Sequence, residues 1–194
     1  PDPAMSGPSQ GRLRGCIRRW TTLQPGPDLP SVRLHTGTDV MELLVLTGER
    51  PEINPEVAER LRSWGHDDFT SYVHWTCERA LERGLLPHTN LGVLSREDLG
   101  RLREVTASQG LMLESISERL VETVHAGSPT KHPARRLETI ELAGELRIPF
   151  TSGILVGIGE TEEERVASLE VLADGHALGL GGAARPFRLR PGDP

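Results

Sequence analysis

Several polar side chains in this sequence stand where an apolar run ends, a position from which they could bind a ligand. They are three carboxylates, one imidazole and one amide: Glu49, His88, Asn90, Glu114 and Glu160. If the apolar runs are strands of one sheet, these polar groups gather at one edge and form a candidate binding site. A second explanation stays open for Glu49 and Glu160, namely that their carboxylates cap helices or satisfy turns.

A glycine-rich segment provides the second chemical signal. An apolar run over 150–156 breaks into Gly157-Ile158-Gly159, and Thr161 and Glu164 then stand at the spacing of a capping box that starts a helix. Glycines at such a turn let the backbone approach a flat or anionic ligand, and the helix N-terminus adds free N–H donors. A tight turn without a ligand explains the same residues, so a binding function depends on the rest of the chain.

The elements that must position these groups alternate between strand and helix. Continuous apolar runs predict strands at 42–47, 85–90, 109–114 and 150–156, although Pro87 weakens a central place for the second. Apolar spacings of three and four predict helices at 55–64, 69–83, 95–105 and 117–124, and from residue 133 onward. This order is typical of an α/β fold with a parallel sheet and outer helices. In such folds ligands bind at the carboxyl ends of the strands.

Length and composition exclude several classes of protein. With 194 residues the chain is short for a complete eight-stranded α/β barrel, which needs about 250. Its 28 acidic residues outnumber the 22 basic ones, giving a net charge of -6, which argues against nucleic-acid binding. No apolar run approaches the roughly 20 residues of a membrane span, and two distant cysteines suggest no disulfide framework. We expect a soluble, cytoplasmic protein.

The composition also suggests three regions. Residues 1–40 are rich in proline and glycine without an apolar period, and we expect a poorly ordered arm. Residues 41–174 hold the alternating strands and helices. Residues 175–194 contain no strand-like run, and we expect an irregular tail.

Six blocks of the chain resemble a known family. They are TGERPE (47–52), GLLPHTN (84–90), SREDLGRLR (95–103), ASQGLMLES (107–115), GSPTKHPARRLETIELAG (127–144) and PFTSGILVGIGETEEER (149–165). In their order and spacing they resemble the radical SAM half of deazariboflavin (FO) synthase, from Glu42 to about Asp174. The resemblance implies that residues 41–174 are a fragment of a radical SAM partial TIM barrel.

The same resemblance implies an activity. Members of this family carry a [4Fe–4S] cluster and S-adenosyl-L-methionine, and a 5'-deoxyadenosyl radical abstracts hydrogen from the substrate. The substrate is an adduct of a tyrosine-derived hydroxybenzyl group and a ribitylamino-uracil, which cyclises with loss of ammonia to the deazaflavin FO. The adduct implies a companion radical SAM subunit or domain that makes it.

The resemblance also implies site residues. It assigns S-adenosylmethionine to Thr47, Gly48, Glu49, Asn90, Glu114, Arg136, Gly157, Ile158, Gly159 and Glu160, and substrate binding to His88. Thr47, Gly48 and Glu49 match a segment that contacts the amino-acid end of the cofactor. Asn90 matches a position that faces the ribose and methionine portion of the cofactor. Glu114 ends a strand beside the cofactor, and Arg136 matches a helical basic residue that can pair with a carboxylate. The glycine segment lies along the adenine.

The chain departs from the family at the cluster motif. Three thiolates in C-x3-C-x2-C hold such a cluster and leave the fourth iron open. After Cys16 the required offsets carry Trp20 and Leu23, and Cys77 stands on the apolar face of a predicted helix, where core packing explains it. We therefore expect no metal ligands in this chain and no radical activity from it alone.

Three interpretations follow from that departure. The chain is by family an FO synthase, represented by a truncated or frame-disrupted gene product; this is the interpretation we favour. Alternatively it is a non-catalytic relic that binds S-adenosylmethionine or a complete partner, which the missing cysteines favour. A third candidate is a sister radical SAM enzyme of the futalosine pathway, against which the PHTN and GLMLES blocks argue.

Overall fold

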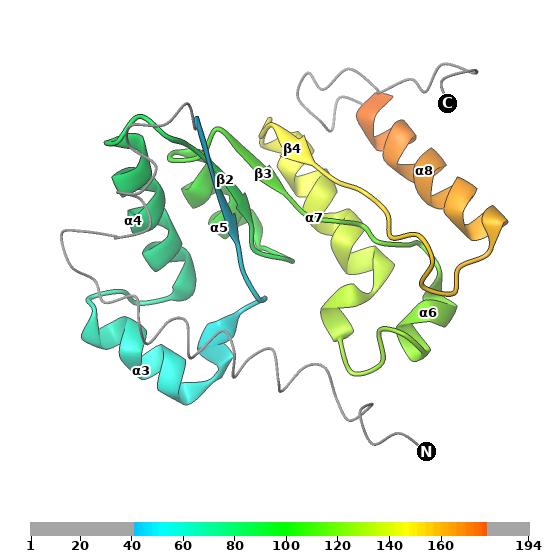
Figure 1. The fold of residues 1–194 in the computed structure, drawn as a ribbon, viewed down its shortest axis with the longest axis horizontal. Coiled ribbons are helices and arrows are strands. Elements are labelled where there is room, and N and C mark those ends of the chain that lie inside the picture. Colours follow the sequence, from blue (N-terminus) through cyan, green and yellow to red (C-terminus); the bar gives the residue numbers. More distant parts are fainter. Residues whose placement is uncertain (1–40, 178–194) are drawn as a thin grey trace. The chain divides into compact units, whose positions relative to one another are not determined.

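The computed structural model describes residues 41–177, and these fall into two compact units that divide between Gly110 and Leu111. Helices lie between the strands of the first unit, whereas the second unit has one short strand between its helices (Figure 1). The first contains β1 (Glu42–Leu46), η1 (Pro51–Ile53), α3 (Pro55–Ser63), α4 (Phe69–Leu81), β2 (Leu86–Asn90), α5 (Arg96–Arg103) and β3 (Ser108–Gly110). The second contains α6 (Glu118–Glu122), η2 (Pro129–Lys131), α7 (Pro133–Glu145), β4 (Phe150–Thr151) and α8 (Glu162–Ala177).

The strands of the first unit are parallel, as predicted. β1 pairs with β2 in the register Leu46↔Asn90, and β2 pairs with β3 in the register His88↔Ser108. The central place of β2 differs from the expectation for a strand that contains Pro87. The proline removes only its own N–H, and its carbonyl still accepts a hydrogen bond from the Ala107 N–H at 2.9 Å. One lost donor is therefore compatible with a central strand here.

The helices of the first unit bury their apolar faces in one core. Leu61 of α3, Val73 and Cys77 of α4, and Leu102 of α5 are each at most 2% exposed and belong to a single cluster. The Asp68 side chain caps α4 by accepting from the Ser71 N–H at 2.6 Å. Cys77 is a core residue, as its place on the apolar helix face predicted.

The second unit contains a parallel pairing that is less regular than predicted. The Leu111 N–H donates to the Thr151 carbonyl, and Glu114 exchanges hydrogen bonds with Gly153 and Leu155 at 3.0 and 2.8 Å. Between these points the Leu113 N–H donates to the Ser152 hydroxyl instead of to a backbone carbonyl. This substitution interrupts the ladder, so the predicted strands at 109–114 and 150–156 appear as β3, β4 and an isolated bridge between Glu114 and Ile154.

Helix α7 does not bury its leucines most deeply. Arg136, Thr139 and Ala143 are at most 2% exposed and recur at helical spacing, whereas Leu137 and Leu142 are half-buried. The predicted arm (1–40) and most of the predicted tail (175–194) lie outside the described residues. Within 41–177, none of the helices combines the length and the apolar character that a membrane crossing requires.

Candidate functional site

The carboxyl ends of β1 and β2 bring predicted site residues of the first unit together. Asn90 is the last residue of β2 and pairs with Leu46, the last residue of β1. The Thr47 N–H continues the ladder by donating to the Asn90 carbonyl at 3.3 Å, and its hydroxyl donates to the Gly48 carbonyl at 3.0 Å. Thr47, Gly48 and Asn90 therefore lie side by side at one edge of this sheet. The pattern of strand ends had pointed to Asn90, whereas Thr47 and Gly48 came from the family resemblance.

A glycine that the sequence did not single out positions Glu49. Gly92 is buried and has φ +86°, and a Cβ built on it would lie 1.9 Å from Cγ of Glu49 and 2.4 Å from its Cδ. The Glu49 side chain thus occupies the space that any other residue at position 92 would fill. The sequence signal for this contact was slight: Gly92 stands two residues after Asn90, the polar residue at the end of a predicted strand.

We expect Gly92→Ala to destabilise the first unit by roughly 1–3 kcal/mol, because it combines a positive φ with a contact that Glu49 must vacate. Gly100→Ala is the matched control. Gly100 lies inside α5 with nothing within 4 Å of a built Cβ, so alanine there should stabilise by about 0.5–1 kcal/mol. Urea denaturation of both variants measures the difference, and equal midpoints would contradict this packing.

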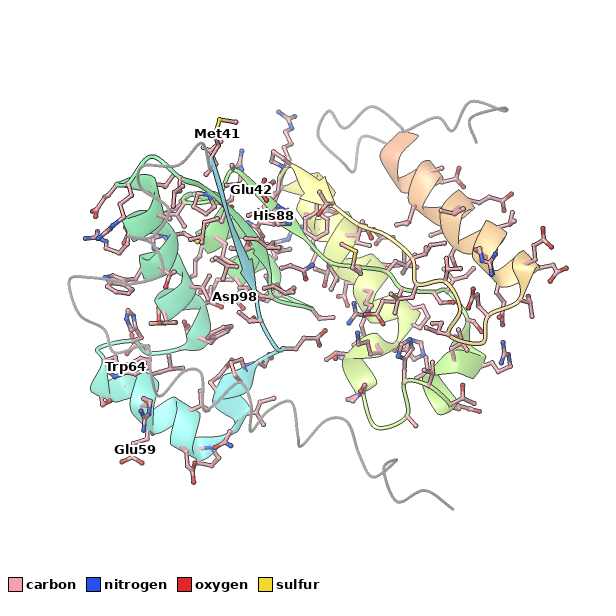
Figure 2. The ribbon with its side chains drawn as sticks, in the orientation of Figure 1. Met41, Glu42, Glu59, Trp64, His88 and Asp98 are labelled. Carbon is pink, nitrogen blue, oxygen red and sulfur yellow. The ribbon has the colours of Figure 1, made fainter. Side chains whose placement is uncertain are left out.

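His88 lies within β2 rather than at its end. The Nδ1 of His88, which is labelled in Figure 2, is 2.6 Å from the Ser108 hydroxyl of β3. Along β2 it alternates with the buried residues Pro87 and Thr89, so it shares a face with Asn90. The same face of β1 carries Leu44 and Leu46, which are more than half exposed. This sheet face therefore combines accessible apolar and polar groups.

In the second unit, Glu114 is buried among basic side chains. It has φ +68° and is 7% exposed. One carboxylate oxygen pairs with Lys131 and lies 3.6 Å from Nη1 of Arg136. The other lies 3.4 Å from Nε2 of His125, whose pKa is lowered by burial. Three basic groups thus surround one carboxylate, and sequence reasoning had found only Glu114 and Arg136 of this cluster.

Arg136 is a structural cation as well as a neighbour of Glu114. Its side chain is 2% exposed, and its guanidinium donates to the carbonyls of Thr130 and Met112. The arginine therefore joins α7 to the loop before it and to the segment that ends at Glu114. Pairing with a carboxylate was predicted for this residue from the family resemblance, and the carboxylate beside it in this structure is the protein's own.

The glycine segment of the second unit folds around its own carboxylate. Gly157 and Gly159 have φ of +85° and +100°. The Glu160 carboxylate accepts from the N–H groups of Gly157 and Ile158 at 2.9–3.0 Å and from Arg165 at 2.7 Å. The Gly157 N–H and the Arg165 guanidinium lower the pKa of Glu160 to about 2. The sequence suggested that backbone N–H groups at this turn are free to bind an anion, but the Glu160 carboxylate occupies those of Gly157 and Ile158. The turn therefore suits an uncharged, flat ligand better than a phosphate.

The described residues do not fit an iron–sulfur cluster. No group of three or more His, Cys, Asp or Glu side chains within 41–177 is arranged to hold a metal ion. Cys77 is fully buried, and burial raises the pKa of its thiol to about 12, so it supplies no thiolate. Cys16, Trp20 and Leu23 lie outside the described residues. No cluster chemistry can therefore be assigned to this part of the chain.

Comparisons with known proteins show which family the chain resembles. Residues 33–172 match the family model described as "Radical SAM superfamily". Three curated relatives are each named 7,8-didemethyl-8-hydroxy-5-deazariboflavin synthase. Those of Methanosphaerula palustris, Methanothermobacter thermautotrophicus and Methanococcus aeolicus are 47%, 46% and 51% identical over 161, 178 and 130 residues. These alignments cover 80%, 89% and 66% of this chain but 48%, 54% and 36% of the relatives, so the chain spans about half their length.

Proposed function

The chain belongs to the radical SAM superfamily, and from that premise we propose that it is the cofactor-binding part of an FO synthase. The similarity to relatives that bear this name carries the proposal, and it favours FO synthase over a sister enzyme of the futalosine pathway. The activity we propose by family is that of a radical SAM lyase, which cyclises the hydroxybenzyl–ribitylamino-uracil adduct to the deazaflavin FO. A companion radical SAM subunit or domain supplies the adduct.

S-adenosylmethionine is the ligand we propose for the strand ends. In the first unit, Thr47, Gly48 and Glu49 would meet its amino-acid end, with Asn90 beside them. In the second unit, the backbone of 157–159 would lie along the adenine, because the Glu160 carboxylate is committed to the turn. Glu114 and Arg136 complete the proposed set. His88, on the same sheet face as Asn90, is proposed to meet the substrate.

When bound to a reduced cluster, S-adenosylmethionine supplies the radical that starts such reactions. We propose no such step for this chain alone, because the cysteine motif is absent from its sequence and the described residues offer no replacement. The function that remains is binding of the cofactor, and a complete enzyme must supply the missing thiolates. The proposal therefore keeps the family activity for a complete enzyme and gives this chain alone the function of a non-catalytic cofactor binder.

Calorimetric titration of the purified chain with S-adenosylmethionine tests the proposal. We expect saturable binding that is weaker than in a complete enzyme, since the amino and carboxyl groups lack an iron to anchor them. Glu49→Gln should weaken binding by about ten- to a hundredfold, because a charged hydrogen bond contributes about 1.5–3 kcal/mol. Glu59→Gln is the matched control, since Glu59 is exposed on α3 (Figure 2). Absence of binding by the unmodified chain would overturn the proposal.

A further inference from the structure

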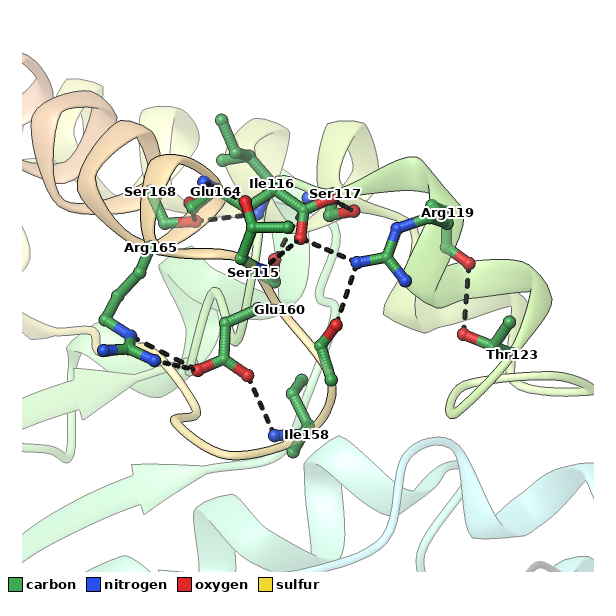
Figure 3. A network of polar contacts seen from close by, with 12 residues as sticks. Ser115, Ile116, Ser117, Arg119, Thr123, Ile158, Glu160, Glu164, Arg165 and Ser168 are labelled. Atoms are coloured by element: carbon green, nitrogen blue, oxygen red, sulfur yellow. Dashed lines mark hydrogen bonds and ion pairs between the residues drawn. The ribbon is translucent and has the colours of Figure 1, made fainter.

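A polar network in the second unit joins the segment after Glu114 to the glycine segment (Figure 3). Its centre is the Glu164 carboxylate in the first turn of α8. One oxygen accepts from the Ser117 hydroxyl at 2.5 Å, and the other accepts from the Thr161 N–H and from Arg119, both at 2.8 Å. Two pieces of chain that are far apart in sequence, 117–119 and 161–164, therefore meet at one side chain.

A second attachment lies one helical turn further along α8. Ser168 is 1% exposed, and its hydroxyl accepts from the Ile116 N–H at 3.1 Å while donating to the Glu164 carbonyl at 2.7 Å. Together with the bond from Ser117 to Glu164, this fixes residues 116 and 117 to α8 at two points. The segment that follows Glu114 is thus held against the helix that follows the glycine segment.

Arg119 extends the network to the glycine segment itself. The same nitrogen, Nη2, donates to the Glu164 carboxylate and to the Gly159 carbonyl at 2.9 Å. Glu160 meanwhile holds the N–H groups of Gly157 and Ile158 from inside the turn. The turn is therefore restrained on both sides by protein groups, without any contribution from a ligand.

We propose that Arg119 and Glu164 are positioning residues that fix residues 157–160 relative to Glu114 before the cofactor binds. The inference rests on the proposed function, in which Glu114 and the glycine segment both contact one S-adenosylmethionine molecule, the latter along its adenine. Two groups that contact one rigid ligand must be held at a set separation, and a preformed separation removes an ordering cost from binding. An ordinary surface ion pair would have no such effect.

The exposure of Arg119 makes this function separable from folding. Its side chain is 52% exposed, so its ion pair adds little to global stability. Loss of the arginine should therefore loosen the turn without unfolding the unit. Arg101 provides the matched control, because it forms an ion pair with Asp68 at the same kind of distance, 2.9 Å, in the first unit.

Hydrogen exchange of the ligand-free chain, followed by mass spectrometry, tests the positioning directly. In Arg119→Met, amides of residues 157–161 should exchange about tenfold faster than in the unmodified chain, the effect of losing about one charged hydrogen bond. Arg119→Lys should restore part of the protection, since an ammonium group can donate to the same acceptors. Arg101→Met should leave these amides unchanged. Unchanged exchange in Arg119→Met would overturn the inference.

Titration with S-adenosylhomocysteine separates this inference from the proposed function. If the unmodified chain binds it and Arg119→Met binds about tenfold more weakly while Arg101→Met does not, the positioning function is supported. Equal affinity in all three proteins would overturn it. If the unmodified chain binds neither this ligand nor S-adenosylmethionine, the proposed function fails, and the assignment of the turn to a cofactor fails with it. The exchange experiment then still decides whether Arg119 holds the turn.

Discussion

Anaerobic reconstitution of the purified chain with ferrous iron and sulfide should yield no [4Fe–4S] cluster. The sequence holds two cysteines, and a radical SAM cluster needs three thiolates at fixed offsets. Trp20 and Leu23 stand at those offsets and supply no thiolate, while Cys77 is fully buried with a pKa raised to about 12. Without a cluster no electron reaches S-adenosylmethionine, so neither 5'-deoxyadenosine nor a deazaflavin should form.

Iron and sulfide analysis with visible absorption spectroscopy measures this outcome. Stoichiometric iron with a reducible charge-transfer band would contradict the prediction and would mean that the chain uses other ligands. The double variant W20C/L23C identifies the cause of the loss, because it restores C-x3-C-x2-C after Cys16. Iron uptake by that variant assigns the loss to the cysteines alone. Continued absence of iron assigns it to the segment that should carry them.

The sequence predicted the elements whose signals are local. β1 follows a continuous apolar run, α4 follows a regular apolar spacing, and α8 starts at the capping box of Thr161 and Glu164, which exchange the two expected hydrogen bonds. Each of these signals lies within a few residues of the feature it predicts. Local propensity and pattern are therefore sufficient for them.

Features that depend on distant partners could not be predicted in the same way. The bond from the Leu113 N–H to Ser152, which interrupts a predicted strand, joins residues 39 positions apart. The close approach of Glu49 to Gly92 depends on how two strand ends turn. The buried stripe of α7 includes a charged residue, Arg136, which hydropathy places on the surface. Tertiary contacts decide all three.

The candidate site shows the same division. Strand pairing brings Asn90, which was predicted from its strand end, beside Thr47, which the family resemblance had pointed to. What their side chains contact was not predictable. One oxygen of the Glu114 carboxylate pairs with Lys131, the Glu160 carboxylate pairs with Arg165, and neither basic partner had a signal in the sequence. Their contacts with a cofactor stay predictions.

The largest loss of stability among single substitutions should come from Arg136→Met. Arg136 and Glu114 are both nearly buried, and the guanidinium satisfies two backbone carbonyls as well as facing the carboxylate at 3.6 Å. Removing the arginine leaves both carbonyls without this donor and leaves Glu114 with Lys131 but without its second cation, a combined loss of about 3–5 kcal/mol. Methionine fills most of the volume, so the loss reports on charge and hydrogen bonding more than on a cavity.

Arg135→Met is the matched control, because Arg135 is the preceding residue of the same helix and is exposed. It should change stability by less than about 0.5 kcal/mol. Urea denaturation at neutral pH compares the two variants, and the double variant Arg136→Met with Glu114→Gln tests the cause. Since that variant also removes the buried carboxylate that has lost its second cation, it should recover part of the loss. A double variant no more stable than Arg136→Met alone would show that Arg136 stabilises the unit through the carbonyls of Met112 and Thr130, with Glu114 contributing nothing.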